Sequence, residues 1–329
     1  MLSRRQFSAG LALAGVAAPT ILRAQAPIRL RLAHATAEVH PGHIAALRFK
    51  EALEKLVPGK VNVQIFPNRQ LGDDKPNLEA TVAGTVDMCM ASGVLVPLVT
   101  GRAAFDAPQL PFLIKDYDHF TKLSLGPAGQ ALLADLEPAG LVGLQLTDIG
   151  TRNFLSVGKP VKRVADFAGL KTRIVPVPLH KAIWEAVGTA PVGLPYGEVY
   201  GALQTKVIDA VEINVSSILG ENLWEVGKHL TLTGHYPWHS IIACNKAKFD
   251  TLPKEVQEAM RQAGRDSTGP TLQYAKEQDI NAREDLKKKG IQIHTLEDLD
   301  DMKKKMAPLI DQYAKKSPLI DAFVKAAMA

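Results

Sequence analysis

The hydrophobic positions in the first third of the chain switch repeatedly between the spacing of a strand and that of a helix. Apolar and polar residues alternate over residues 28–33 and 61–65, and residues 86–91 form a short apolar run, which predicts three strands. Between them, residues 42–57 carry apolar side chains at helical spacing, and we expect Asp73 to cap a second helix. This β-α-β-α-β order predicts a parallel sheet covered by helices.

A second unit of the same kind follows after Gly140. Its strands are expected at residues 141–146, 171–175 and 208–211, and its helices at residues 179–187 and 196–205. We expect the two units to join near residues 147–150, and residues 253–329 to be mainly helical. Two α/β lobes of comparable size predict a hinged clamshell, in which a ligand binds between the lobes and closure buries it.

The first 26 residues have the features of an export signal. An arginine pair, Arg4 and Arg5, precedes an apolar run from Ser8 to Ile21, which is too short to span a bilayer. Residues 24–26 form an A-x-A cleavage pattern, and the arginine pair before Phe7 fits a twin-arginine signal as well as an ordinary secretory one. Either signal predicts that the mature protein leaves the cytoplasm.

Charge argues against nucleic acid as a partner. The formal net charge is +5, but three arginines and no acids lie in the first 26 residues, which leaves 5 − 3 = +2 for the rest. The remaining basic residues are scattered, and the lysine runs 287–289 and 303–305 have acidic neighbours, as expected of solvated helix faces.

Two cysteines, Cys89 and Cys244, lie in apolar runs that resemble strands. Export permits a disulfide, but a cysteine in such a run usually packs as a small apolar side chain. We therefore expect two buried thiols rather than a bridge.

Catalytic and metal-binding patterns are missing from the sequence. It has no G-x-G-x-x-G, G-x-x-x-x-G-K-[ST], G-x-S-x-G or H-E-x-x-H pattern. His235 and His239 have the i, i+4 spacing of a metal site on a helix, but Pro237 between them rules out a regular helix. The paired acids Asp73 and Asp74 have the pattern of a helix cap or surface charge. The sequence thus predicts a binding protein rather than an enzyme, with no metal and no cofactor.

Polar residues at the ends of the predicted strands are the candidate ligand contacts. Because strand ends of an α/β protein converge on one crevice, these side chains are expected to meet there. Arginine is notable among them, since its planar fork matches a carboxylate. The candidates are His34, Ser92, Arg152, Arg173, Glu212 and Asn214.

Six segments of the sequence resemble a known family. They are HATAEVHPGH at 34–43, FPNRQLGDD at 66–74, LPFLIKD at 110–116, GTRN at 150–153, LKTRIVP at 170–176 and GEVYGALQTKVIDAVE at 197–212. The chain is similar to the periplasmic substrate-binding subunit of a tripartite ATP-independent periplasmic (TRAP) transporter of the DctP type. The resemblance spans nearly the whole chain after residue 26.

The resemblance implies roles for individual residues and a division into lobes. Arg173 would form a bidentate salt bridge with a substrate carboxylate, Arg152 would be a second anion contact, and Tyr196 would pack on the substrate. The implied fold has two mainly parallel sheets, strands that cross between the lobes and a long C-terminal helix spanning both. We place lobe I at residues 27–149 plus about 236–270, and lobe II at residues 150–235 plus about 271–329.

The implied function is that of a periplasmic receptor for a small organic acid. It would be a monomer that delivers its ligand to a large and a small membrane permease subunit, which use an ion gradient. A subunit that presents the ligand to a sensor kinase is an alternative, and an exported enzyme acting on carboxylic acids is disfavoured because no nucleophile or base pair is visible.

The chain departs from the family pattern at two positions. Ile213 separates Glu212 from Asn214 where relatives often have an adjacent amide, and Ser92 stands where sialic-acid binders carry an acid. Both changes remove polar groups, while Tyr196 and Trp238 would add aromatic surface to the pocket. On this evidence we expect a short keto or hydroxy acid, or an aromatic acid, rather than a sialic or uronic acid.

Overall fold

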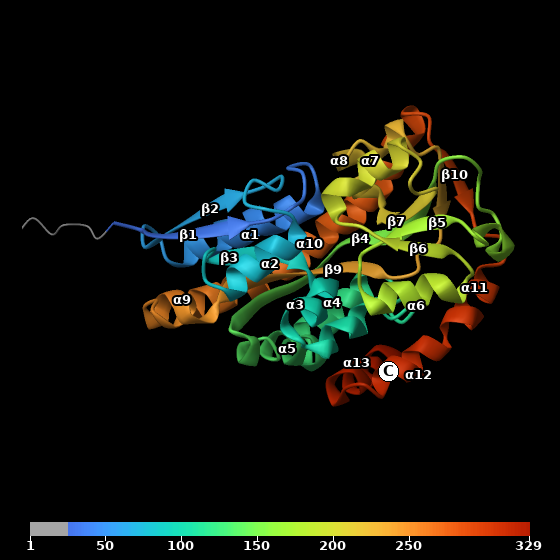
Figure 1. Ribbon diagram of the computed structural model, residues 1–329. Helices are drawn as coiled ribbons and strands as arrows, with labels where there is room; N and C mark the ends of the chain where they lie inside the picture. Colours follow the sequence, from blue (N-terminus) through green and yellow to red (C-terminus); the bar gives the residue numbers. More distant parts are fainter. Residues whose placement is uncertain (1–25) are drawn as a thin grey trace, which may run out of the picture.

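The computed structural model describes residues 26–329. In these residues ten strands form one continuous mixed sheet (Figure 1). Eight of the strands follow the order β2-β1-β3-β9-β4-β7-β5-β6, while β8 pairs with β4 and β10 pairs with β8. The predicted signal peptide lies outside these residues except for Ala26. The strands are β1 (Ile28–Ala33), β2 (Val61–Phe66), β3 (Met88–Ser92), β4 (Leu141–Ser156), β5 (Lys171–Ile174), β6 (Ala190–Gly193), β7 (Ala210–Asn214), β8 (His229–Leu232), β9 (Pro237–Asn245) and β10 (Gln292–Thr295).

The continuous sheet divides into two parts that share β4. In the first half, β2, β1, β3 and β4 run in one direction and β9 runs against them. In the second half, β5, β6, β7, β8 and β10 run in one direction and β4 runs against them. Each half is therefore a mainly parallel sheet with one antiparallel strand, β9 in the first half and β4 in the second. Strand β4 belongs to both halves, so the predicted fold class is confirmed.

Helices cover both halves of the sheet (Figure 1). Those nearest the first half are α1 (Pro41–Leu56), α2 (Asp74–Val82), α3 (Val96–Thr100), α4 (Tyr117–Leu125), α5 (Pro127–Ala134) and α9 (Lys246–Asp250), and those of the second half are α6 (Pro178–Ala186), α7 (Val199–Gln204) and α8 (Val215–Gly220). The terminal helices α11 (Leu299–Met306), α12 (Pro308–Ala314) and α13 (Pro318–Met328) lead back from α6 to α5. Across residues 26–329, no helix combines the length and the apolar character needed to cross a membrane.

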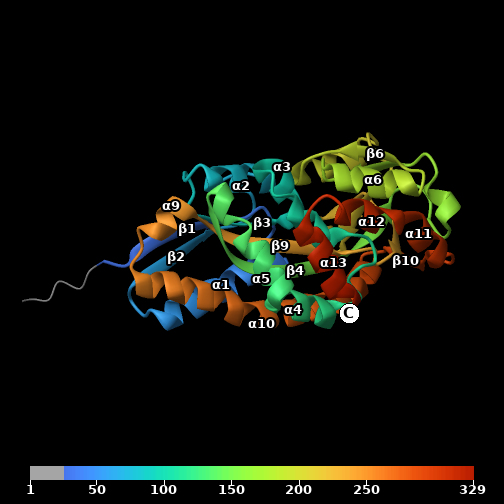
Figure 2. The same ribbon diagram turned by 90° about the horizontal axis from the view of Figure 1, so that it is seen from below.

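The helix α10 (Lys254–Lys288) is 35 residues long and joins the two halves. It lies along α1 in the first half, as Figure 2 shows, and also contacts α8 and β10 in the second half. Against β4 it approaches so closely that a Cβ added to Gly264 would lie 1.8 Å from the carbonyl oxygen of Leu144. Glycine at this position is therefore what allows the helix to pack directly on the crossing strand.

Strand β4 is much longer than the sequence predicts. The expected strand ends at residue 146, where Thr147, Asp148 and Gly150 break the apolar run, but pairing continues to Ser156 with a register shift between Asp148 and Thr151. The polar residues are tolerated because β4 pairs first with β9 and then with β7 and β8. As a consequence, Arg152 lies inside a strand rather than after one.

The two cysteines occupy neighbouring strands and are not bridged. Cys89 on β3 and Cys244 on β9 are both free and fully buried. Burial raises the pKa of each thiol to about 12, so both remain protonated and pack as apolar side chains. The expectation of two buried thiols is confirmed.

The contact between α10 and β4 gives a first prediction. Gly264→Ala should destabilise the protein by about 1–3 kcal/mol or more, because the new methyl group meets backbone that cannot move aside. The matched control is Gly201→Ala at an exposed position of helix α7, where an added Cβ meets nothing within 4 Å. That change should be neutral or stabilise by about 0.5–1 kcal/mol. Denaturant unfolding of both variants measures the difference, and equal stabilities would contradict the proposed packing.

Candidate functional site

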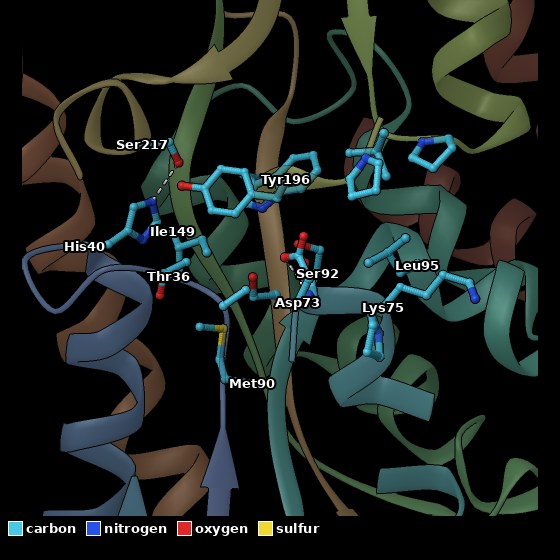
Figure 3. Close-up of a pocket in the computed structure, with 18 of the residues that line it drawn as sticks. Thr36, His40, Asp73, Lys75, Met90, Ser92, Leu95, Ile149, Tyr196 and Ser217 are labelled. Atoms are coloured by element: carbon cyan, nitrogen blue, oxygen red, sulfur yellow. Dashed lines mark hydrogen bonds between the residues drawn. The ribbon is translucent and has the colours of Figure 1, made fainter. Parts of the chain in front are cut away.

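A cavity of about 430 Å³ lies between the two halves (Figure 3). The first half lines it with the loop after β1, the start of α2 and the end of β3. The second half contributes β4, the end of β5, α8 and residues 195–198, and the first residues of β9 complete the wall. Strand ends thus converge on one crevice, and the volume is typical of a small-molecule site.

Arg173 is a buried cation with one free edge. Its Nε and Nη2 donate to the carbonyl oxygen of Leu194 at 3.0 and 2.8 Å, and its Nη1 makes no hydrogen bond to any residue in 26–329. Burial lowers the pKa of Arg173 to about 10, with the charge of Glu212 opposing the shift, so the guanidinium stays protonated at neutral pH. No carboxylate within the described residues forms a salt bridge with it.

Arg152 is held differently, because it has a carboxylate partner. Its Nε donates to Oε2 of Glu212 at 2.7 Å, and its Nη2 donates to the backbone carbonyl of the same residue. The guanidinium carbon lies 3.9 Å from the ring centre of Trp238, which forms a cation–π contact. Arg152 and Trp238 both line the cavity.

Glu212 lies behind Arg152 and does not line the cavity. Tyr236 donates its hydroxyl to Oε2 at 3.0 Å, His235 Nε2 lies 3.8 Å from the same oxygen, and His180 Nδ1 lies 3.6 Å from Oε1. Burial alone acts to raise the pKa of Glu212, but the charge of Arg152 and the contacts with His235 and His180 outweigh it and hold that pKa well below its usual range. Glu212 is therefore an ionised counterion that orients Arg152.

Two aspartates and a serine form the opposite wall. Asp73 caps α2 as expected, and its Oδ2 also accepts a hydrogen bond from Gly197 N of the second half at 3.0 Å. Asp74 accepts hydrogen bonds from the backbone and the hydroxyl of Ser92. Burial raises the pKa of Asp74 to about 6, although the Ser92 hydroxyl opposes the shift. In the sequence these two acids have the pattern of a helix cap or surface charge, so Asp74 is a cavity residue that only the structure reveals.

The loop after β1 brings His40, not His34, to the cavity. His34 Nε2 lies 3.0 Å from His43 Nδ1, and its Nδ1 lies 3.0 Å from the hydroxyl of Thr36, so its ring is held inside the first half. His40 caps α1 and its Nε2 lies 3.1 Å from the hydroxyl of Ser217, the contact drawn in Figure 3. The signal for His40 in the sequence is the proline that follows it, which marks a helix start.

Asn214 and Ile213 project from opposite faces of β7. Asn214 pairs with Arg152 across the strands, but its amide donates to Ile149 O at 2.9 Å and contacts His40 at 3.2 Å, outside the cavity. Ile213 is fully buried in the apolar core of the second half. Because side chains alternate along a strand, the apolar residue between Glu212 and Asn214 packs away from the ligand site.

Tyr196 lines the cavity and lies against a contact between the halves. Its ring centre is 5.4 Å from the guanidinium of Arg69, which binds Glu221 through two hydrogen bonds of 3.1 and 2.8 Å. Arg69 also donates to the backbone of Ala35 at 3.2 Å. This ion pair links the loop after β2 to the end of α8.

The cavity thus gathers five of the eight residues predicted from sequence and leaves three outside. Those lining it are Ser92, Arg152, Arg173, Tyr196 and Trp238. Glu212, Asn214 and His34 lie behind the wall, where Glu212 orients Arg152. No group of three or more metal-binding side chains occurs in the part of the chain that the structure describes.

Comparison with known proteins identifies the family. Residues 32–317 match the family described as bacterial extracellular solute-binding protein, family 7. The chain belongs to this family. It is 34% identical over 293 residues to the C4-dicarboxylate-binding periplasmic protein DctP of Rhodobacter capsulatus, covering 88% of this chain and 87% of that protein. It is 32% identical to the 2,3-diketo-L-gulonate-binding periplasmic protein YiaO of Escherichia coli, covering 90% and 89% of the two chains.

Solved structures of TRAP periplasmic solute-binding proteins share the fold. One from Bradyrhizobium sp. BTAi1, in complex with galacturonate, superposes with a TM-score of 0.86 at 31% identity, covering 91% of this chain and 99% of that one. The sugar acid binding protein DctPAm from Advenella mimigardefordensis, in complex with galactonate, also has a TM-score of 0.86, at 25% identity and 92% and 98% coverage.

The buried ion pair between Arg152 and Glu212 gives a second prediction. Glu212→Gln should destabilise the protein by about 3–5 kcal/mol at pH 7, because it leaves Arg152 buried without a counterion. A carboxyl group whose pKa is lowered by folding stabilises the folded state at every pH above its pKa in the unfolded chain. This stability is lost only as the pH falls towards the pKa in the folded state. Since that folded pKa lies well below the usual range, the deficit should persist from pH 5 to pH 8.

The matched control is Glu185→Gln, which removes an exposed i, i+4 partner of Lys181. It should change the free energy of unfolding by less than about 1 kcal/mol. Denaturant unfolding at several pH values measures both variants. A Glu212→Gln protein as stable as the control would show that Arg152 does not depend on this carboxylate.

Proposed function

We propose that the protein is a periplasmic receptor that binds an organic acid anion between its lobes and delivers it to the membrane subunits of a TRAP transporter. The observation that carries this proposal is the unequal pairing of the two buried arginines. Glu212 neutralises Arg152, whereas Arg173 has no carboxylate partner among residues 26–329 and keeps Nη1 free beside the cavity. A buried cation without a counterion is costly, and a ligand carboxylate would supply the missing charge.

The remaining cavity wall favours a ligand that carries several hydroxyl groups. Asp74 offers carboxylate oxygens, and Ser240 has a buried hydroxyl without a hydrogen-bond partner in the described residues. Thr36 and Ser217 add two more hydroxyls. Because unpaired buried polar groups are destabilising, these groups are matched better by a hydroxylated acid than by an aromatic one. We therefore revise the expectation from sequence and propose a sugar acid, the class bound in the galacturonate and galactonate complexes.

The contacts between the halves support a closed clamshell. We propose residues 27–149 plus about 236–270 as lobe I and residues 150–235 plus about 271–329 as lobe II. On this division, the pair Arg69–Glu221 and the hydrogen bond from Gly197 to Asp73 both cross the cleft. Ligand exchange would require these contacts to break, and ligand binding would favour their formation. We further propose that the protein acts as a monomer and catalyses no reaction.

Arg173 provides the direct test of the carboxylate site. Arg173→Ala should weaken binding of a sugar acid at least 100-fold, which corresponds to about 2.7 kcal/mol, because the ligand carboxylate loses its cation. Arg173→Lys should also bind weakly, since an ammonium cannot reproduce the planar fork. Calorimetry measures both, with circular dichroism to confirm folding. Binding within threefold of wild type in a folded Arg173→Ala protein would refute the proposed function.

Ser240 tests the class of ligand. Galacturonate or galactonate should bind at least tenfold more tightly than pyruvate or benzoate, since each polar group left unpaired costs about 1–3 kcal/mol. Ser240→Ala should weaken binding of the sugar acid and leave that of pyruvate nearly unchanged. Calorimetric titration of both proteins with these acids decides the matter, and tighter binding of benzoate or pyruvate would restore the interpretation made from the sequence.

A further inference from the structure

His180, which contacts Glu212, is a fully buried histidine on α6 that lies outside the cavity. Its ring stacks on Tyr236, with 5.3 Å between ring centres and an angle of 22° between the planes. It also contacts Trp238, whose ring centre is 5.9 Å away. Because both faces and edges of the ring are enclosed, its two nitrogens point in fixed directions.

Those directions lead to two polar groups on different segments. Nε2 lies 2.6 Å from the side-chain amide oxygen Oε1 of Gln109, and Nδ1 lies 3.6 Å from Oε1 of Glu212. Gln109 ends the 3-10 helix Ala103–Gln109, which packs on α3, α13 and β9. His180 therefore joins that segment of the first half to the carboxylate that holds Arg152.

The proton on His180 can be placed by the hydrogen bonds around it. If Nε2 carries the proton, it donates to Gln109, and the lone pair of Nδ1 then faces an ionised carboxylate oxygen. In that arrangement His180 Nδ1, Glu212 Oε1 and Gln109 Nε2 are all buried without a partner. A proton on Nδ1, with the Gln109 amide turned so that its nitrogen donates to Nε2, gives the Gln109 nitrogen a partner and points an N–H at Oε1 of Glu212, 3.6 Å away.

The surroundings agree with a neutral ring and one fixed tautomer. The pKa of His180 is lowered to about 3, mainly by burial and also by the charges of Arg152 and Arg173, while the charge of Glu212 opposes the shift. The distance of 3.6 Å between Nδ1 and Oε1 exceeds that of a hydrogen bond, so the neutral ring acts on Glu212 as a dipole close to a charge. An N–H dipole pointing at the carboxylate is the favourable orientation.

We propose that His180 is a positioning residue for the anion site: its Nδ1–H holds Oε1 of Glu212, Gln109 fixes the tautomer, and Glu212 in turn aims Arg152 at the ligand. This inference rests on the proposed function for its effect on binding. The position of Arg152 depends on Glu212 through Oε2 and the backbone carbonyl. A carboxylate free to rotate would loosen the contact through Oε2 and leave Arg152 held only by the backbone carbonyl.

A matched pair of substitutions separates positioning from simple packing. Asparagine places an amide where Nδ1 lies, and glutamine places one where Nε2 lies. His180→Asn should therefore keep the contact with Glu212 and bind galacturonate within threefold of wild type. His180→Gln should keep only the contact with Gln109 and weaken binding about tenfold, as should His180→Phe. Equal losses in the Asn and Gln variants, or wild-type affinity in the Gln variant, would overturn the proposal.

Two measurements without ligand keep this test independent of the proposed function. Nitrogen-15 NMR of the imidazole should show the Nδ1–H tautomer in the wild-type protein and its loss in Gln109→Leu. His180→Gln should lower the melting temperature in the wild-type background but add nothing in Glu212→Gln. An Nε2–H tautomer, or additive effects in the double variant, would refute the role of His180. If wild type fails to bind galacturonate while both measurements succeed, the ligand assignment fails and the positioning contact stands.

Discussion

The cavity depends on the buried ion pair between Arg152 and Glu212. Two charges are removed from water together, which is tolerable only because further donors, among them the hydroxyl of Tyr236, surround the carboxylate. The pair is neutral as a unit, and Arg173 therefore remains the cation that lacks a counterion. The preference of the cavity for an anion follows from this division of charge rather than from the number of arginines.

The same elements that connect the two halves also form the binding site. Strand β4 carries Arg152 and strand β9 carries Trp238, and the two strands pair along the first half. A ligand that contacts these residues would therefore touch the strands that connect the two halves, and α10 packs against β4 at Gly264. The contact of Arg69 with Glu221 connects the loop after β2 to the end of α8, and the proposed opening of the cleft would break it.

A side chain that is chemically out of place in its segment is the easiest cavity residue to find from the sequence. Arg173 stood out because it lies in an apolar strand, and the structure puts it at the cavity wall. His34 and His40 could not be separated, because both sit in a short polar loop and only the path of that loop decides which one faces the cavity. Asp74 was missed since an acid beside a helix start has an ordinary local explanation.

The sequence by itself determined the alternation of strands and helices, the two-lobed class and the presence of arginines suited to a carboxylate. These features depend on the spacing of apolar residues and on side-chain chemistry, and both can be read from residues that are close together in the sequence. Only the tertiary structure decided that β4 continues through its polar middle, that Glu212 binds Arg152 and that His180 faces Glu212. Each of these depends on strand pairing and packing between segments that are far apart in the chain, and local periodicity carries no information about such partners.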